Sequence, residues 1–347
     1  MNITTVGVDL AKIVFQTHGV DERGKVGLRR QLKRAQMMSF FANLPPCLIG
    51  MEACASAHFW ARKLTELGHT VKLMAPQFVK PYVKTNKHDV ADAEAICEAV
   101  GRPNMRFVAV KNAEQQALLG LHRARQSFVG ARTAQANQIR GLLAEFGIVF
   151  AKGIGWVTKK MPEILEDAEN GLPGMSRELF SRLLTHFREL DRQVKELEGQ
   201  IQAWHRDDAA SVRLQGIPGI GPITASALVA SIGDASAFKS GRQLAAWLGL
   251  VPRQSSTGGK VQLLGISKRG DTYLRTLLIH GTRSVLRHLK SGGTPTQRWL
   301  ERLLTRCHPN VAAVALANKN ARIAWALLAH GRDYQSGYVT ARTAAAA

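Results

Sequence analysis

Residues 4–18 read TTVGVDLAKIVFQTH, and this stretch decides the fold class of the N-terminal part. Two runs rich in Val, Ile, Thr and Phe, at 4–8 and 13–18, flank the link Asp9–Lys12, and they predict two short strands. Further along the chain, strand-like runs at 25–31, 47–51 and 70–74 alternate with helix-like runs at 56–67 and 89–100. We therefore expect an α/β domain whose mixed sheet carries helices on its faces.

The chain is strongly basic. Its 347 residues, enough for two or three domains, include 47 Lys+Arg against 26 Asp+Glu, a formal charge of +21. Because 45% of the residues are hydrophobic, the excess does not mark a disordered tail. Nucleic acid is the favoured partner, since cations that neutralise phosphates release condensed counterions. An acidic small-molecule enzyme and a neutral housekeeping fold are disfavoured.

The cysteines and the apolar stretches indicate the cellular compartment in which the protein is expected to work. Cys47, Cys54, Cys97 and Cys307 form no C-x-x-C pair, which disfavours a thiolate zinc site and a disulfide framework. Charged residues occupy the N-terminal stretch that a signal peptide would need to be apolar, and the most apolar stretch, 311–329, is interrupted by two cations. We expect a soluble protein of the bacterial cytoplasm, associated with the nucleoid, and no membrane partner.

The middle of the chain predicts two long helices. Asn112-x-x-Gln115 resembles a capping box and Gly147 a C-terminal stop, with 153–174 expected as an irregular connector. A second helix over 176–207 spaces its apolar residues as a coiled-coil seam does. Those residues are Phe180, Leu183, Phe187, Leu190, Val194, Leu197, Ile201 and Trp204. The alternatives are a helix packed on its own domain, an antiparallel pair with 112–147, or a dimerising arm.

Four carboxylates stand at strand ends and on one helix. Asp9 and Glu52 each follow a strand, and Asp89 and Asp92 lie nearly one turn apart on a helix. Four converging acids need compensation, for which the hard cations Mg²⁺ or Mn²⁺ are suited. Two such ions about 4 Å apart would clamp an in-line phosphoryl displacement. Taken singly, each acid is also explained as a surface carboxylate, and Asp89 as a helix N-cap.

The segment 214–225, LQGIPGIGPITA, predicts a short glycine turn before a helix. Backbone N–H groups at Gly219 and Gly221 would then face a ligand beside a helix N-terminus, as in the helix-hairpin-helix element of DNA-repair proteins. The alternative is a tight joint between two helices without a ligand.

A hydroxyl-rich loop follows at 249–260, GLVPRQSSTGGK, and then LGISKRGD at 264–271. Ten Lys/Arg and one acid fall between residues 235 and 290, the densest positive stretch of the chain. Candidate phosphate ligands are Arg253, Lys260, Lys268 and Arg269. A serine of the loop is a candidate nucleophile toward phosphorus, and the residues alone also allow a phosphate-binding loop without covalent catalysis.

Several blocks in this order resemble one family. They are VGVDLAK (6–12), MEA (51–53), KHDVADAEA (87–95), IPGIGPITA (217–225), LGLVPRQ (248–254) and GISKRGDTYLR (265–275). Over about residues 5–335 the chain is similar to transposases of the insertion sequence 110 family, the bridge-RNA-guided recombinases. The resemblance implies a RuvC-like (RNase H-like) domain at 1–108, a coiled-coil region at 109–208, a transposase domain at 209–335 and a tail at 336–347.

The resemblance also implies the site. The Asp-Glu-Asp-Asp metal ligands would be Asp9, Glu52, Asp89 and Asp92, and a serine would attack the DNA backbone with help from the acids of a partner subunit. Ser256 is the expected nucleophile, although Thr257 is the residue before the glycine, and Ser255 is the reserve. A structured guide (bridge) RNA would pair with donor and target DNA, and the protein would act as a dimer or tetramer.

Two other functions remain open from the sequence. A metal-dependent junction nuclease would use the serine loop only to hold phosphate. An architectural nucleic-acid-binding protein would need no converging acids, and it ranks below both enzymes.

Overall fold

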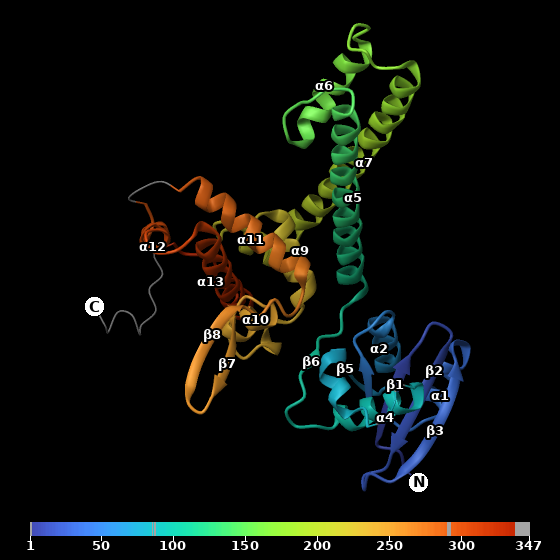
Figure 1. The fold of residues 1–347 in the computed structure, drawn as a ribbon. Coiled ribbons are helices and arrows are strands. Elements are labelled where there is room, and N and C mark those ends of the chain that lie inside the picture. The colour runs from blue at the N-terminus through green and yellow to red at the C-terminus, as the bar shows by residue number, and fades with distance from the viewer. Residues whose placement is uncertain (1, 85, 87, 290–292, 337–347) are drawn as a thin grey trace. The chain divides into compact units, whose positions relative to one another are not determined.

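The computed structural model describes residues 2–84, 86, 88–289 and 293–336 (Figure 1). The chain divides into two compact units, Met1–Gln116 with Ile232–Ala237, and Ala117–Ser231 with Phe238–Ala347. The first boundary lies close to the one expected at residue 108, and the second unit contains both the long helices and the C-terminal part. Most of the expected tail, 337–347, lies outside the described residues.

Unit 1 contains a six-stranded mixed sheet in the order β3-β2-β1-β4-β5-β6. The strands are β1 (Thr5–Leu10), β2 (Val14–Val20), β3 (Val26–Lys33), β4 (Leu48–Glu52), β5 (Thr70–Met74) and β6 (Phe107–Val108). β1, β2 and β3 are antiparallel neighbours, β1, β4 and β5 run parallel, and β6 is antiparallel to β5. The predicted mixed sheet is confirmed, and its first five strands fall where the sequence placed them.

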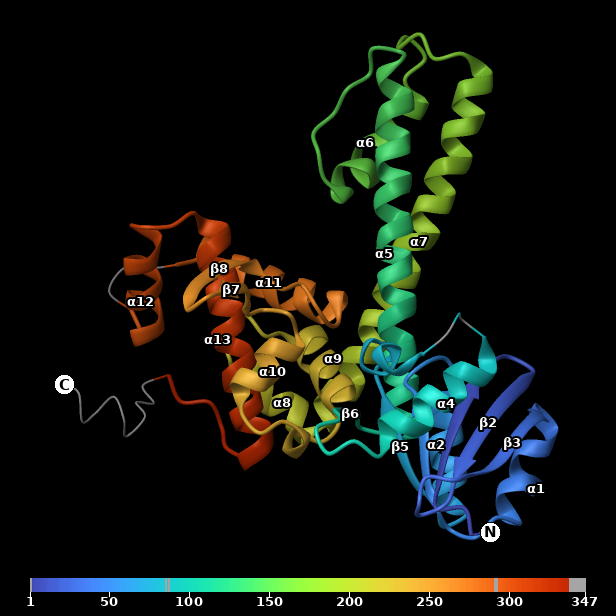
Figure 2. The same ribbon diagram turned by 60° about the horizontal axis from the view of Figure 1, so that its bottom comes forward.

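Helices cover both faces of this sheet (Figure 2). They are α1 (Met37–Ala42), α2 (Ala57–Glu66), α3 (Pro76–Val79) and α4 (Asp89–Val100), with 3₁₀ turns at Arg34–Gln36 and Lys80–Tyr82. Val6 and Val8 are buried with residues of α1 and α2. Gly7 points to the other face, where a Cβ would lie 2.2 Å from the Ala93 carbonyl oxygen. The missing side chain therefore lets α4 cross directly over β1.

Two long helices of unit 2, α5 (Ala113–Ala144) and α7 (Gly174–Asp207), pack antiparallel. Arg125 pairs with Glu198 near one end and Arg132 with Asp191 further along, at 2.5 Å in each case. Ala136, Ile139 and Leu143 meet Phe180, Leu184 and Phe187 in a shared core. The contacts therefore hold the two helices together within a single chain.

The start of α5 is the predicted capping box. The Asn112 side chain accepts from the Gln115 N–H at 2.7 Å, and the Gln115 side chain accepts from the Asn112 N–H at 3.0 Å. On α7, however, Leu184 and His205 are buried while Leu183 and Trp204 are only half-buried, so the buried line departs from the expected seam.

The expected irregular connector was wrong, because residues Ile154–Glu166 form helix α6. Its buried Val157 and Met161, one turn apart, join the core between α5 and α7. Pro162 lies inside this helix, where a sequence reading expects a break. Packing of the apolar face outweighs the hydrogen bond that the proline removes.

The rest of unit 2 is mostly helical. Its elements are α8 (Ala209–Gln215), α9 (Pro222–Ile232), α10 (Gly241–Trp247), β7 (Pro252–Thr257), β8 (Lys260–Ile266), α11 (Thr272–Arg287), α12 (Pro295–Leu304) and α13 (Pro309–His330), and a 3₁₀ turn in unit 1 spans Ala235–Ala237. One face of α13, including Ala313, Ala317 and Ala321, is fully buried. No helix within the described ranges is long and apolar enough to cross a membrane.

The hydroxyl-rich segment forms an antiparallel hairpin, β7–β8, rather than the expected loop. Gly258 and Gly259 connect the strands with φ of 54° and 78°. Two consecutive positive φ values match the type I′ turn that suits the twist of a two-stranded ribbon. A glycine-flanked run of hydroxyl residues is typical of a loop, but the Gly-Gly pair is itself a hairpin signal, and threonine is favoured in strands.

Candidate active site

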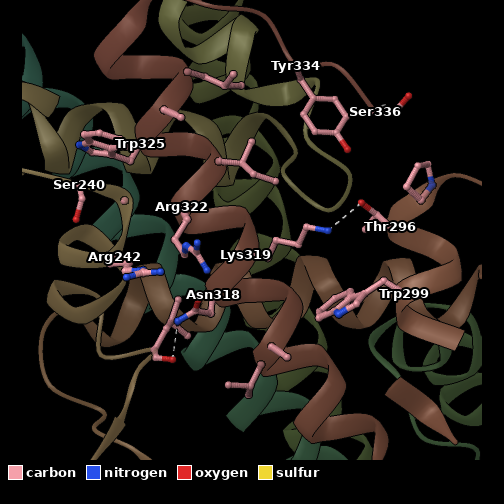
Figure 3. Close-up of a pocket in the computed structure, with 18 of the residues that line it drawn as sticks. Ser240, Arg242, Thr296, Trp299, Asn318, Lys319, Arg322, Trp325, Tyr334 and Ser336 are labelled. Atoms are coloured by element: carbon pink, nitrogen blue, oxygen red, sulfur yellow. Dashed lines mark hydrogen bonds between the residues drawn. The ribbon is translucent and has the colours of Figure 1, made fainter. Parts of the chain in front are cut away.

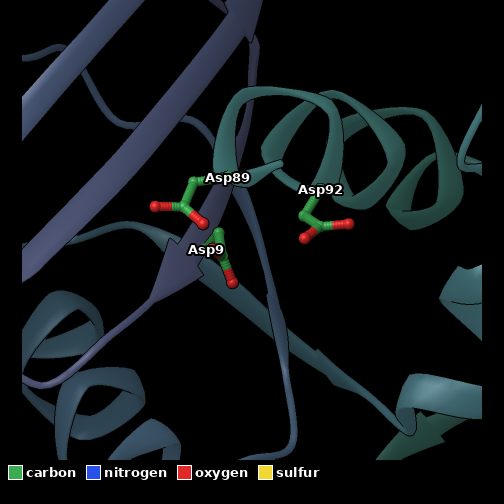
Figure 4. A group of neighbouring side chains, drawn as sticks. All are labelled: Asp9, Asp89 and Asp92. Carbon is green, nitrogen blue, oxygen red and sulfur yellow. The ribbon is translucent and has the colours of Figure 1, made fainter. Parts of the chain in front are cut away.

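Three of the four predicted acids converge at the end of β1 and the beginning of α4 (Figure 4). Asp9, Asp89 and Asp92 each offer a carboxylate oxygen, and these oxygens lie within 4.8 Å of one another. His88 caps α4, since its Nδ1 accepts from the Ala91 N–H at 3.3 Å. Asp89 is therefore the first helical residue, not the cap, and Asp92 lies one turn further on the same side.

Glu52 is the last residue of β4, the parallel neighbour of β1. Because Met51 is paired with Val8, Glu52 and Asp9 follow at the same edge of the sheet. Its carboxylate does not belong to the group of three oxygens within 4.8 Å. The fourth acid thus stands beside the cluster, one strand away.

Cys54 is a neighbour of this site that the sequence analysis missed. The pKa of its thiol is raised, first by desolvation and then by the negative charges of Glu52 and Asp9. The effect of both acids on one thiol shows that they share a neighbourhood. The sequence feature that could have identified Cys54 is its position two residues after Glu52, in the segment MEAC.

The acidic cluster fits a divalent cation by its donor set. Carboxylate oxygens are the hard ligands that Mg²⁺ and Mn²⁺ prefer, and close like charges need such compensation. Lys84 does not supply it, because its Nζ binds Glu98 at 2.9 Å and Glu94 at 3.5 Å. Asp89 is exposed while Asp9 and Asp92 are half-buried, so a bound ion would keep one side open to a substrate.

Ser256 is the next-to-last residue of β7, close to the turn, and lies opposite Val261. All six residues of β7 are exposed, and the Ser256 hydroxyl accepts from the Gln254 amide at 2.8 Å. Side chains alternate along a strand, so Ser256 points to the opposite face from Ser255 and Thr257. The three candidate nucleophiles are therefore not equivalent, and a substrate at one face meets either Ser256 or the other two.

The base of the hairpin is held tightly. A Cβ on Gly249 would lie 2.0 Å from the Arg269 carbonyl oxygen, and one on Gly270 would lie 1.9 Å from the Trp247 carbonyl oxygen. Arg275 is buried and donates to the carbonyls of Leu248 and Arg269 at 3.1 and 3.2 Å. Arg275 is a positioning residue that the sequence analysis did not single out, although it closes the motif GISKRGDTYLR.

The predicted phosphate ligands cluster around this hairpin in the chain. Arg253 lies on β7 and Lys260 begins β8, while Lys268 and Arg269 follow β8 directly, and all four are exposed. Lys268 has a φ of 54°, an uncommon value for a residue with a side chain. The structure thus keeps four cations near the base and the strands of the hairpin, with their charges available to an anion.

In the glycine turn between α8 and α9, the first glycine allows close packing against a neighbouring helix. Gly219 has a φ of 90° and faces Gly281 of α11, where a Cβ would lie 3.0 Å from the Gly281 backbone. Asn320 donates to the Pro218 carbonyl at 2.8 Å and fixes the turn from α13. Gly221 is exposed directly before α9, with nothing within 4 Å of its Cβ position.

Comparisons with known proteins match both the N-terminal and the C-terminal parts of the chain. Residues 6–148 match the family model DEDD_Tnp_IS110, a transposase, and residues 211–297 match the transposase IS116/IS110/IS902 family. The chain is 57% identical to a probable family 20 transposase of Pseudomonas aeruginosa, over 97% of this chain and 100% of that protein. It is 46% identical to the transposase for insertion sequence element IS1328 of Yersinia enterocolitica, over 95% and 98% respectively. It is 45% identical to the transposase for IS1111A of Coxiella burnetii, over 97% and 92%.

Proposed function

This chain belongs to the IS116/IS110/IS902 family of transposases, enzymes of DNA strand cleavage and transfer, and from that premise we propose an RNA-guided recombinase of an insertion sequence. In this proposal the enzyme exchanges DNA strands through a serine phosphodiester intermediate. The observation that carries the enzymatic part is the convergence of Asp9, Asp89 and Asp92 on one small volume. A protein that only bound nucleic acid would have no use for such a cluster.

The acids would hold Mg²⁺ or Mn²⁺, with Glu52 joining from the neighbouring strand. When bound, the cation would offset the charge of the acids and polarise a phosphoryl oxygen of DNA. The rigid placement of Asp9 on β1 and of Asp92 on α4 would orient that phosphate. The half-open side of the cluster leaves room for a backbone phosphate.

Ser256 would be the nucleophile. Its Oγ forms a bond to a DNA phosphorus, the bond from phosphorus to the leaving deoxyribose oxygen breaks, and the hydroxyl proton passes to solvent while the leaving oxygen gains one. Strand exchange reverses the step with a different deoxyribose hydroxyl. Arg253, Lys260, Lys268 and Arg269 would stabilise the added negative charge on phosphorus.

The finer parts of the fold and assembly belong to the same proposal. Unit 1 would be a RuvC-like nuclease domain, α5 with α7 a coiled coil, and α8–α9 a helix-hairpin-helix with Gly221 toward phosphate. A guide RNA would supply the choice of donor and target DNA. A dimer or tetramer would bring the serine of one subunit to the acids of another, and the +21 charge supports binding of both nucleic acids.

The decisive experiment traps the covalent intermediate. Wild-type protein, incubated with its element-end DNA, guide RNA and Mg²⁺, should give a protein–DNA adduct that survives denaturation, and Ser256→Ala should give none. Ser255→Ala and Thr257→Ala are matched controls on the opposite face of β7 and should keep adduct formation. Undiminished adduct in Ser256→Ala, with its loss in Thr257→Ala, would move the nucleophile to Thr257.

One observation favours the alternative of a metal-dependent junction nuclease. The Ser256 hydroxyl accepts a hydrogen bond from the Gln254 side-chain amide, and an amide is not a base that could remove the hydroxyl proton. In that case Ser256 would only hold phosphate, and the cleaved DNA would carry a free phosphate end rather than protein. The same trapping experiment separates the two functions.

A further inference from the structure

A wide groove opens in unit 2 between α10, the base of the β7–β8 hairpin, α12 and α13 (Figure 3). Its volume is about 1960 Å³. It shares Pro252 and the end of β8, residues 264–266, with the hairpin but none of the predicted catalytic or phosphate-binding residues. The groove is thus a second feature of the C-terminal part, with its own chemistry.

The groove is lined along its length by one face of α13. Val311, Ala315, Asn318, Arg322 and Ala326 follow at helical spacing and line it, while the opposite face is buried in the core. The two cations that interrupt the apolar stretch 311–329, Lys319 and Arg322, both fall on the groove face. Because helical spacing puts both cations on the same face of α13, they place positive charge inside an otherwise apolar groove.

Of the four Lys and Arg residues that line the groove, three stand without a matching acid, and the fourth, Arg332, is next to Asp333 in the chain. Lys319, Arg322 and Arg242 form no ion pair with any residue in the described ranges, whereas Asp333, the acid of the lining, pairs with Arg213 at 3.3 Å. Gly241 allows the close approach that brings Arg242 beside Arg322, since a Cβ there would lie 2.8 Å from the Arg322 carbonyl oxygen. Positive charges held this close, without an acid, are complementary to an anion.

Aromatic rings accompany these cations. The Lys319 Nζ lies 4.9 Å from the centroid of the Trp299 ring and donates to the Thr296 hydroxyl at 3.3 Å. The Trp325 indole is fixed by its hydrogen bond to the Phe238 carbonyl at 3.0 Å. Tyr334 contributes a third ring at the rim, as Figure 3 shows. Flat rings interleaved with cations are the lining typical of single-strand nucleic-acid sites.

We propose that this groove binds an unpaired segment of RNA, with Arg242, Lys319 and Arg322 on its phosphates and unstacked bases against Trp299 and Tyr334. The inference rests on the proposed function, which supplies a structured RNA as partner. RNA is favoured over DNA because a structured RNA carries loops with splayed bases at all times, whereas a DNA strand is unpaired only where the guide RNA has displaced it. The pKa of Lys319 is lowered by burial and by the charge of Arg322, so the charged form of this lysine is destabilised. A bound phosphate would stabilise that charged form.

Direct binding tests the inference without any recombination step. The probe is a fluorescein-labelled oligouridine of about 12 nucleotides, within the site size of single-strand grooves. The same oligomer of deoxyuridine and a DNA duplex of equal length are compared. The proteins are full-length wild type, Lys319→Met, Arg322→Gln, Trp299→Phe and Lys159→Met. The last is a matched control, because Lys159 lies 5.4 Å from the Trp156 ring on α6, outside the groove.

We expect Lys319→Met and Arg322→Gln each to lower oligouridine affinity about tenfold, and each to reduce the slope of log affinity against log salt by about 0.7. Duplex binding and the control should stay unchanged. Arg322 is exposed, so Arg322→Gln should keep the wild-type melting temperature.

Three outcomes overturn the inference. Unchanged oligouridine binding in both cation variants removes the groove from RNA recognition, and an equal loss on duplex DNA reduces it to general electrostatics. An equal loss on oligodeoxyuridine assigns the groove to a DNA strand instead. Failure of the proposed function looks different, since wild type would then lack the adduct whatever the groove variants do.

Discussion

The acidic cluster and the serine hairpin are built in opposite ways. Asp9 and Asp92 stand on a strand and a helix that cross in direct backbone contact at Gly7, next to a fully buried core. Ser256 stands on a two-stranded ribbon whose β7 residues are all exposed. The base of the ribbon is held by Arg275 and by the close contacts at Gly249 and Gly270.

The acids and the serine are therefore positioned by different physical means. The acids are preorganised by packing, so their mutual geometry holds before any substrate arrives. The hairpin has few buried contacts, which is the property of segments with low local stability. Under the proposed function, a serine on such a ribbon would follow a bound phosphate, while the acids would set where that phosphate lies.

The largest effect is expected at the acids. The double change Asp9→Asn, Asp92→Asn should lower recombination between plasmids by about a thousandfold, since metal stabilisation of charge is worth several kcal/mol. Mn²⁺ should raise the melting temperature of the wild type and leave that of the variant unchanged. Glu94→Gln is the control, because Glu94 lies on the same helix but binds Lys84. Wild-type recombination in the double variant would refute the acidic site.

The next effect tests the packing under the acids. Gly7→Ala places a Cβ 2.2 Å from the Ala93 carbonyl oxygen, so α4 must move or the backbone must shift. We expect a loss of about 3 kcal/mol in the free energy of unfolding, measured in urea, together with weaker Mn²⁺ binding. Gly101→Ala, at the end of the same helix with open space around it, should change neither. Equal stability of the two variants would show that the crossing is loose.

The smallest effect is expected at the hairpin turn. Gly258 has a φ of 54°, so Gly258→Ala should cost about 1 kcal/mol locally. The melting temperature should hardly change, because little core depends on the ribbon, while the amides of β8 should exchange faster with deuterium. Gly265→Ala, on β8 with nothing near its Cβ position, is the matched control. A cooperative loss of global stability would show that the hairpin is part of the core.

The sequence predicted elements whose signals are local. The runs rich in Val, Ile, Thr and Phe on either side of Asp9 predicted β1 and β2, and Asn112 with Gln115 predicted the start of α5, because β-rich composition and a capping box are properties of neighbouring residues. The convergence of Asp9 with Asp89 and Asp92 was also accessible, since strand ends and one helical turn fix those directions. The position of Glu52 just outside the group depends on side-chain rotamers and the exact strand register, which no pattern encodes.

Other features depend on tertiary packing and were missed. Helix α6 contains Pro162, and only the core contacts of Val157 and Met161 explain why the helix continues. The groove depends on α12 lying beside α13, which brings Trp299 to Lys319. In the sequence, Lys319 served only to exclude a membrane span. Its proposed role as a ligand for an anion rests on the face of α13 on which it lies.

The antiparallel pairing of α5 and α7 has a consequence for the length of this helix pair, which we call the arm. The chain leaves at the start of α5 and returns at the end of α7, so both ends lie at the same end of the pair. Equal insertions in the two helices would extend the arm by about 1.5 Å per residue in each helix. The entry into α8 would stay where it is. Arm length is therefore a quantity that relatives can vary, and that an engineer can set, without redesigning the domain that carries the serine.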